Sequence, residues 1–241
     1  MDLSVIYVAS ILFAAAYLQS ATGFGLALVC MALVPIILPV TEAIAYVSLA
    51  SLLVNSFIIF ANRSGLSLRR ALPLCIGIVL GIPVGYFALG ALESKLVIRL
   101  LGVTLMVIAA AEFLQGRYAK IHIPEKAGGL MGMLGGILAG AFNVGGPPIV
   151  IYTYARSWSK VEVVAILQTA FLAGGLARNL LMLGAGEVNV ELLILVAWTV
   201  PTAILAVWLG KLTLDRLPHM LLKRFVFALI FLIGLSYLFS S

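Results

Sequence analysis

Charged residues are scarce in this sequence. Only 10% of the 241 residues are Asp, Glu, Lys or Arg, against about 25% in an average soluble domain. Hydrophobic residues make up 63%, and the mean hydropathy is +1.21. A chain with so little charge and such long apolar runs is not an ordinary soluble domain, so the composition predicts an all-α polytopic membrane protein set in the lipid bilayer.

Cysteine and histidine are scarcer still, with two of each. Cys30 and Cys75 lie far apart in apolar segments without a second ligand at metal-binding spacing, so we expect no metal site and no disulfide. His122 and His219 fall in polar connections. The apolar segments contain no Ser/His pair, HExxH motif, paired carboxylates or phosphate-binding loop, so we expect neither enzymatic activity nor a cofactor.

The positive net charge of +6 does not indicate nucleic acid as a partner. The lysines and arginines form short clusters between the apolar runs, where membrane proteins carry their topology signals. We therefore expect no nucleic-acid binding.

Eight apolar segments follow one another along the chain: 3–38, 43–60, 71–92, 96–114, 127–155, 161–184, 190–210 and 219–239. Six have ordinary lengths for a membrane-spanning helix, which needs about 20 residues. The segments 3–38 and 127–155 are longer than one crossing needs, and each is either a re-entrant hairpin or two short full crossings, of which the hairpin fits better.

The longer motif of the chain, Gly140-Ala-Phe-Asn-Val-Gly-Gly-Pro-Pro148, interrupts segment 127–155. Two adjacent prolines lack backbone donors and break a helix, and they suit the first turn of a new one. The pattern predicts one helix that ends near Gly140 and another that begins at Pro147. Irregular backbone at membrane depth is tolerated where it lines a protein-enclosed or water-filled cavity.

Thr22-Gly-Phe-Gly25 interrupts segment 3–38 in the same way. We interpret both long segments as broken, re-entrant hairpins that enter and leave the membrane on one side. For the other glycine clusters, Gly128-Gly-Leu-Met-Gly132 and Gly135-Gly136, close helix packing is the expected role.

The basic residues favour this hairpin topology. With Met1 outside, 12 of the 15 basic residues lie in inner loops, namely Arg63, Arg69, Arg70, Arg117, Lys120, Lys126, Arg156, Lys160, Lys211, Arg216, Lys223 and Arg224. If each long segment crossed once, six would lie inside and eight outside, against the positive-inside bias. We expect an inner (plasma) membrane protein with both termini extracytoplasmic.

The two halves resemble each other at offsets of 120 and 125 residues, which place Gly25 over Gly145 and Gly85 over Gly210. This indicates a tandem duplication. We expect a first repeat at 1–116, a cytoplasmic linker at 117–126 and a second repeat at 127–241. Each repeat holds one hairpin and three spans, so the second repeat is inverted, and inverted repeats place substrate near the midplane at their interface.

The motifs Ala21-Thr-Gly-Phe-Gly25 and Gly140-Ala-Phe-Asn-Val-Gly-Gly-Pro-Pro148 resemble the duplicated glycine signature of the sulfite exporter TauE/SafE family, and the likeness covers essentially the whole chain. The resemblance implies a transporter of small anions, often sulfur-containing ones such as sulfite, sulfoacetate or other organosulfonates. The first motif departs from the family form, because Phe24 and Leu26 stand where glycine is common.

The two breaks also favour an anion on physical grounds, because helix N-termini offer unpaired amides and a partial positive charge. Arg178, inside a span, is either an anion-binding selectivity element or an arginine that reaches the outer face or pairs with Glu187. The predicted substrate-binding residues are Gln19, Ser20, Thr22, Gly23, Phe24, Gly25, Asn143, Val144, Gly145, Gly146, Pro147 and Arg178. Asn55 and Gln168 either line the pathway or bond between helices.

These observations predict a secondary transporter that alternates access around the two breaks. An anion channel and a non-transporting membrane scaffold protein are the alternatives. Coupling to a proton or sodium ion and homo-oligomer formation stay open from the sequence.

Overall fold

A computed structural model describes residues 3–118, 123–213 and 219–239 of the chain. Within these ranges the protein is helical and contains no strand. The helices are α1 (Leu3–Thr22), α2 (Leu26–Leu33), α3 (Val40–Ala61), α4 (Leu68–Gly90), α5 (Ser94–Tyr118), α6 (Gly128–Phe142), α7 (Gly146–Tyr154), α8 (Lys160–Gly184), α9 (Val190–Thr213) and α10 (His219–Leu238). Short 3-10 turns at Val34–Ile36, Arg63–Gly65 and Glu125–Ala127 join some of them.

Within the described ranges, six helices are long and apolar enough to cross a membrane. They comprise Leu3–Thr22, Val40–Ala61, Leu68–Gly90, Ser94–Ala111, Lys160–Gly184 and Val190–Leu212. The prediction of an all-α polytopic membrane protein is confirmed.

Both predicted helix breaks are present. Segment 3–38 divides into α1 and α2, and segment 127–155 divides into α6 and α7. Helix α6 runs two residues past Gly140, and α7 begins at Gly146, one residue before the predicted Pro147. At 1.5 Å per residue the eight residues of α2 and the nine of α7 are about 12 and 14 Å long. These two arms are therefore too short to cross a bilayer core of about 30 Å.

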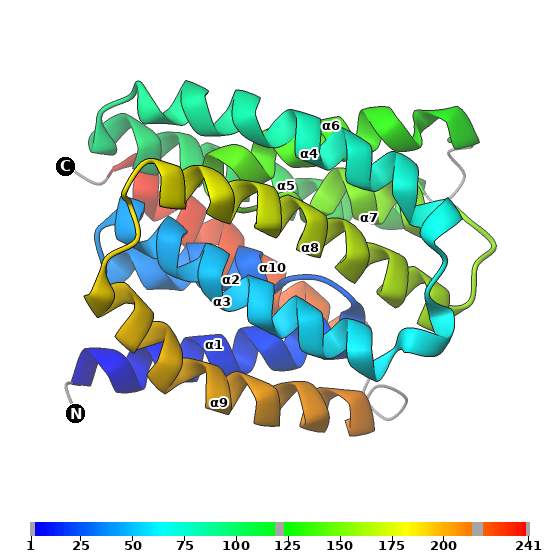
Figure 1. The fold of residues 1–241 in the computed structure, drawn as a ribbon, viewed down its shortest axis with the longest axis horizontal. Helices are drawn as coiled ribbons and strands as arrows, with labels where there is room; N and C mark the ends of the chain where they lie inside the picture. Colours follow the sequence, from blue (N-terminus) through cyan, green and yellow to red (C-terminus); the bar gives the residue numbers. More distant parts are fainter. Residues whose placement is uncertain (1–2, 119–122, 214–218, 240–241) are drawn as a thin grey trace.

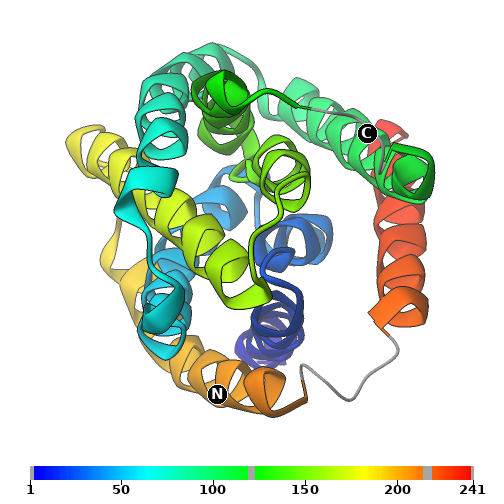
Figure 2. The ribbon, with the colours of Figure 1, turned by 90° about the vertical axis from the view of Figure 1, so that its right-hand side faces the viewer.

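The helices run lengthwise between two ends of the molecule (Figure 1). Both chain termini lie at the left end of this view, where α3 also begins, so the first hairpin returns to the end from which it started. Helices α6 and α8 begin at the right end, so the second hairpin returns there. Viewed along the helices, α5 and α10 form an outer pair at one side of the bundle (Figure 2).

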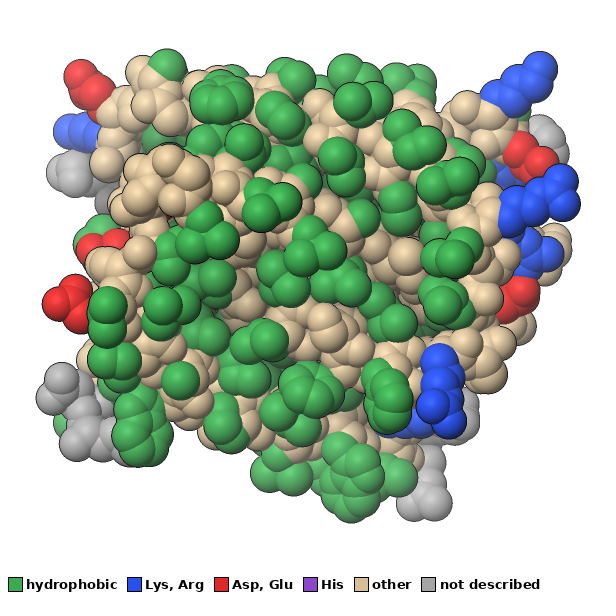
Figure 3. Space-filling model, in the orientation of Figure 1, with side chains coloured by type: hydrophobic (Ala, Val, Ile, Leu, Met, Phe, Trp, Pro, Cys, Tyr) green, Lys and Arg blue, Asp and Glu red, His purple; other side chains and the backbone are tan. Residues whose placement is uncertain are grey.

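Charged side chains gather at the two ends of the molecule, and apolar side chains cover the belt between them (Figure 3). The end with the α3–α4 and α7–α8 connections carries Arg63, Arg69, Arg70, Arg156 and Lys160. The opposite end carries Glu42, Glu93, Glu187 and Glu191, together with Lys95 and Arg99. Some residues lie outside the described ranges: Asp2, Lys120, His122, Arg216 and part of the predicted linker 117–126.

Helix α6 packs most extensively against α4, and α1 against α9. Glycines let the α4 and α6 backbones approach closely: a methyl group on Gly81 would come within 2.8 Å of the Ile137 amide nitrogen, and one on Gly136 within 2.9 Å of the Gly81 Cα. The close-packing role expected for Gly132 and Gly136 matches this interface, as small residues do in membrane helix pairs.

Candidate functional site

The first break is a short non-helical stretch between α1 and α2. Gly23 has φ 83° and Gly25 has φ 116°, a region that side chains other than glycine rarely adopt. Helix α2 then starts at Leu26. The sequence forms this turn because glycine alone meets both angles without strain.

The second break turns at Asn143, which has φ 58° and ψ 16° and ends α6. It is the one non-glycine residue with positive φ among the described residues, and asparagine tolerates this left-handed conformation better than most. Two prolines follow in the first turn of α7, where their missing N–H groups cost no intrahelical bond.

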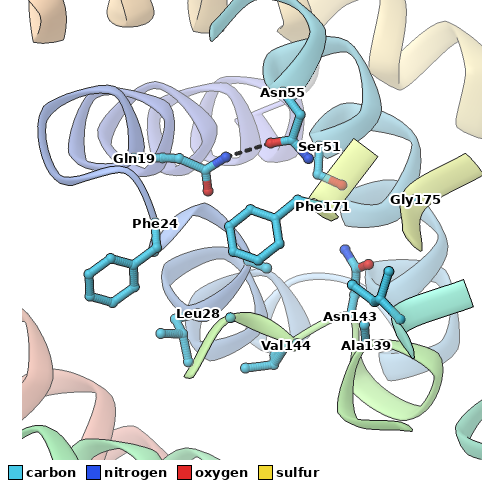
Figure 4. Close-up of a pocket in the computed structure, with 15 residues that line it drawn as sticks. Gln19, Phe24, Leu28, Ser51, Asn55, Ala139, Asn143, Val144, Phe171 and Gly175 are labelled. Atoms are coloured by element: carbon cyan, nitrogen blue, oxygen red, sulfur yellow. Dashed lines mark hydrogen bonds between the residues drawn. The ribbon is translucent and has the colours of Figure 1, made fainter. Parts of the chain in front are cut away.

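The two breaks meet at one cavity (Figure 4). It offers about 50 Å³ to the centres of water-sized molecules, which is room for a few waters or one small ion, since one water needs about 10–15 Å³ on this measure. Its lining consists of Gln19, Phe24, Gly25, Ala27, Leu28, Ser51, Asn55, Ile78, Ala139, Asn143, Val144, Gly145, Gly146, Phe171 and Gly175. Seven of the twelve predicted site residues are among them.

A cluster of three buried amide side chains, Gln19, Asn55 and Gln168, fixes the first break. Gln19 Nε2 donates to Asn55 Oδ1 at 2.5 Å and to Gln168 Oε1 at 3.1 Å. Gln19 Oε1 accepts from the Leu26 amide at 3.0 Å, and Gln168 Nε2 donates to the Gly23 carbonyl at 2.7 Å. The cluster thus joins α1, α3 and α8 to both flanks of the turn.

Asn143 presents an unused donor at the second break. Its Nδ2 is buried and has no hydrogen-bond partner among the described residues, and its side chain lies at the cavity wall opposite Gln19 (Figure 4). A buried donor without a partner is costly, so a ligand or water that enters the cavity gains a bond there.

The backbone donors at the two breaks differ. At α2 the Leu26 amide is taken by Gln19, while Ala27 and Leu28 line the cavity with first-turn amides that have no intrahelical partner. At α7 the prolines remove two first-turn donors, so the amides near the cavity belong to Val144, Gly145 and Gly146.

Four predicted site residues are not in the lining of this cavity. Ser20 Oγ donates to the Val207 carbonyl at 2.8 Å and so ties α1 to α9. Thr22 Oγ1 donates to the carbonyls of Leu18 and Phe24. Gly23 supplies the carbonyl that Gln168 binds, and Pro147 belongs to the first turn of α7.

Arg178 is the fifth residue outside the lining. It is only 3% exposed, and its Nη1 donates to the carbonyls of Ala139, at 2.7 Å, and Gly140. Its guanidinium lies 5.6 Å from the ring centroid of Tyr86, whose hydroxyl donates to Glu187 Oε1 at 2.7 Å. Arg178 thus binds the end of α6, and Tyr86 stands between it and Glu187.

Sequence reasoning missed seven lining residues altogether: Ala27, Leu28, Ser51, Ile78, Ala139, Phe171 and Gly175. A partial signal existed for two of them. Ser51 lies one turn before Asn55 on α3, and Phe171 lies one turn after Gln168 on α8, so each shares a helix face with a polar residue already considered for the pathway.

The chain is similar to known proteins over nearly its whole length. A family model described as "Sulfite exporter TauE/SafE" matches residues 8–237. A protein of Cupriavidus necator named "Probable sulfite/organosulfonate exporter TauE" is 26% identical over 233 residues, which cover 94% of this chain and 91% of that protein. No solved structure matches the chain significantly.

Proposed function

This chain belongs to the sulfite exporter TauE/SafE family, and from this membership and the cavity we propose that it works as a secondary transporter of small anions by alternating access. Family membership by itself shows that the chain is a multi-pass membrane protein for anion transport and not an enzyme.

The observation that carries the proposal is the meeting of both helix breaks at one cavity. Each break brings the start of a helix to the cavity, where first-turn amides lack intrahelical partners, and Asn143 Nδ2 adds a side-chain donor. Donors without acceptors in an otherwise apolar setting favour a negatively charged guest. The substrate-binding set that we propose is therefore centred on Gln19, Phe24, Gly25 and residues 143–146.

We propose a small sulfur-containing anion as the substrate: sulfite, sulfoacetate or another organosulfonate. The name of the relative from Cupriavidus necator supports this choice. The lining supports it too, because Phe24, Leu28 and Phe171 offer apolar surface to a short carbon chain while the breaks offer donors to its anionic head. The small size of the cavity favours a compact molecule.

We propose that residues 1–116 and 127–241 form two inverted repeats, and the helix pairing supports this. Gly85 of α4 packs against Ala141 of α6, and Gly210 of α9 packs against Tyr17 and Ser20 of α1. The duplication that places Gly85 over Gly210 also places α6 over α1, so each interface is the counterpart of the other.

This pairing also indicates which helices move together. Each hairpin packs most extensively against a helix of the other half, α6 on α4 and α1 on α9. The two halves of the sequence therefore do not separate as units. We propose that α1, α2 and α9 move together against α4, α6 and α7.

A transport assay with purified protein in liposomes tests the proposal. We expect saturable uptake of labelled sulfite or sulfoacetate and counterflow against an unlabelled internal pool, and we expect Asn143→Ala to reduce both. Flux without saturation or counterflow would instead assign a channel. Imposed proton and sodium gradients in the same assay would identify a coupling ion.

A binding measurement separates transport from a scaffold role. A scaffold predicts that none of sulfite, sulfoacetate, sulfate and small carboxylates raises the melting temperature of the detergent-solubilised protein. A transporter predicts a concentration-dependent rise with at least one of them, because a ligand that binds only the folded state stabilises it.

A further inference from the structure

The second break brings two opposite helix ends to the same place. The N-terminus of α7 carries about half a positive charge, but the C-terminus of α6 carries a comparable negative one. For an anion beside Asn143 these two partial charges oppose each other. A broken helix therefore attracts an anion strongly only if something offsets its carbonyl end.

Arg178 binds that carbonyl end. Its Nη1 donates to the carbonyls of Ala139 and Gly140, in the last turn of α6 before Asn143. An arginine at a helix C-terminus compensates the negative end of the dipole. The negative end of α6 then no longer offsets the partial positive charge at the N-terminus of α7.

The charge of Arg178 is not neutralised by direct contact. The ion pair found among the described residues joins Arg70 to Glu162 at the other end of the molecule, and the Nε of Arg178 is buried with no hydrogen-bond partner in the same part of the chain. Glu187 makes no ion pair with Arg178 but is near enough to attract it electrostatically, and Tyr86 contacts both side chains. In a buried setting such a charge acts over a longer range than it does in water.

Arg178 is also close to the cavity without lining it. Ala139, whose carbonyl it binds, is a lining residue, and Gly175 lines the cavity from one helical turn earlier on α8. The first break is held instead by the neutral amide cluster of Gln19, Asn55 and Gln168.

We propose that Arg178 sets the charge selectivity of the cavity without touching the anion, by cancelling the carbonyl end of α6 and adding a buried positive charge behind the second break. It is a positioning residue, and this role rests on the proposed transport of anions. The mark of a charge effect is that its size grows with the charge of the ligand, whereas a purely structural role weakens all ligands alike.

The test compares the dissociation constants of sulfate, a dianion, and methanesulfonate, a monoanion, for the full chain in detergent. In Arg178→Gln we expect the constant to rise about tenfold for methanesulfonate and about a hundredfold for sulfate, a charge-proportional loss for a point charge roughly 10 Å away. Arg178→Lys keeps the charge and should change both constants less than threefold. Arg99→Gln, which removes an exposed arginine from α5, is the matched control and should change neither.

Equal losses for the two anions in Arg178→Gln, or losses in Arg178→Lys as large as those in Arg178→Gln, would overturn the proposal. If Arg178→Gln does not fold, Arg178→Lys decides, because two constants within threefold of the wild type support the proposal and a larger rise in either constant refutes it. If the wild-type protein binds neither anion and none of the panel above, the proposed function itself fails, which is a different result from a wild type that binds and variants that do not discriminate.

Discussion

Gln19 and Gln168 are bonded to each other at 3.1 Å, and between them they hold both flanks of the first helix break. Gln19 caps the Leu26 amide at the start of α2, and Gln168 binds the Gly23 carbonyl on the other flank. The two residues are 149 positions apart in the chain and belong to different predicted repeats. The shape of the first break therefore depends on the second half of the sequence.

Replacing Gln168 by leucine should destabilise the protein. The variant leaves the Gly23 carbonyl and one Gln19 donor unpaired in a buried site, which costs about 1–3 kcal/mol, since Gln168 is fully buried. The measurement is the ligand-free melting temperature in detergent. Thr169→Val is the matched control, because the Thr169 hydroxyl bonds only within its own helix, to the Ala165 carbonyl. A Gln168→Leu variant as stable as this control would contradict the interpretation of the cluster.

A larger side chain at residue 146 should block the cavity without disturbing the fold. A methyl group there would meet only the Phe171 ring, at 3.7 Å, which is ordinary contact. We therefore expect Gly146→Ala to lower liposome uptake modestly and Gly146→Val to reduce it at least tenfold, with melting temperatures close to that of the wild type.

Gly145 is the wrong position for this experiment, although the sequence offers it equally. A methyl group on Gly145 would come within 2.7 Å of the Ala139 Cβ, so its substitution disturbs the α6–α7 packing. The matched control for Gly146→Val is Gly184→Val, because nothing lies within 4 Å of a methyl group on Gly184. Full transport by Gly146→Val would show that the cavity is not on the transport pathway.

Much of this fold could be predicted from the sequence because membrane solvation leaves few options. Apolar length defined the spans, and Gly23, Gly25 and the proline pair at 147–148 marked the two breaks, since glycines allow a left-handed turn and two adjacent prolines favour the start of a helix over its interior. The predicted span 161–184 differs from α8 by one residue. The local sequence was therefore sufficient to predict the spans and the two breaks.

The interior of the site could not be predicted in the same way. Phe171 and Ile78 are apolar residues on apolar helices, and nothing in their own segments distinguishes a cavity wall from a helix interface. Ser20 looked like a ligand donor but bonds to Val207 on α9. These roles depend on which helices become neighbours, and that is decided by glycine stripes such as Gly81 and Gly136, whose partners lie far away in the chain.

Alanine at Gly81 should separate α4 from α6, the first helix of the second hairpin. The added methyl group would lie within 2.8 Å of the Ile137 amide nitrogen, so α4 and α6 must move apart, at a cost of about 1–3 kcal/mol. The check is the melting temperature of Gly81→Ala against Gly90→Ala, because a methyl group on Gly90 has nothing within 4 Å. Equal melting temperatures would show that α4 and α6 do not form the rigid unit that we propose.

The basic end of the molecule should face the cytoplasm, with both termini outside. Single cysteines test this in a variant from which Cys30 and Cys75 have been removed. Ser64 lies in the α3–α4 connection beside Arg63, and Ser94 lies at the start of α5 beside Glu93; both are exposed. The positive-inside bias predicts that a membrane-impermeant maleimide added to intact cells labels Ser94→Cys but labels Ser64→Cys only after the membrane is permeabilised.

Because the two positions lie at opposite ends of the same bundle, each is the control for the other, and the reverse pattern would invert the proposed orientation. Labelling of both in intact cells would contradict a membrane-spanning arrangement of α4, since these residues flank its two ends.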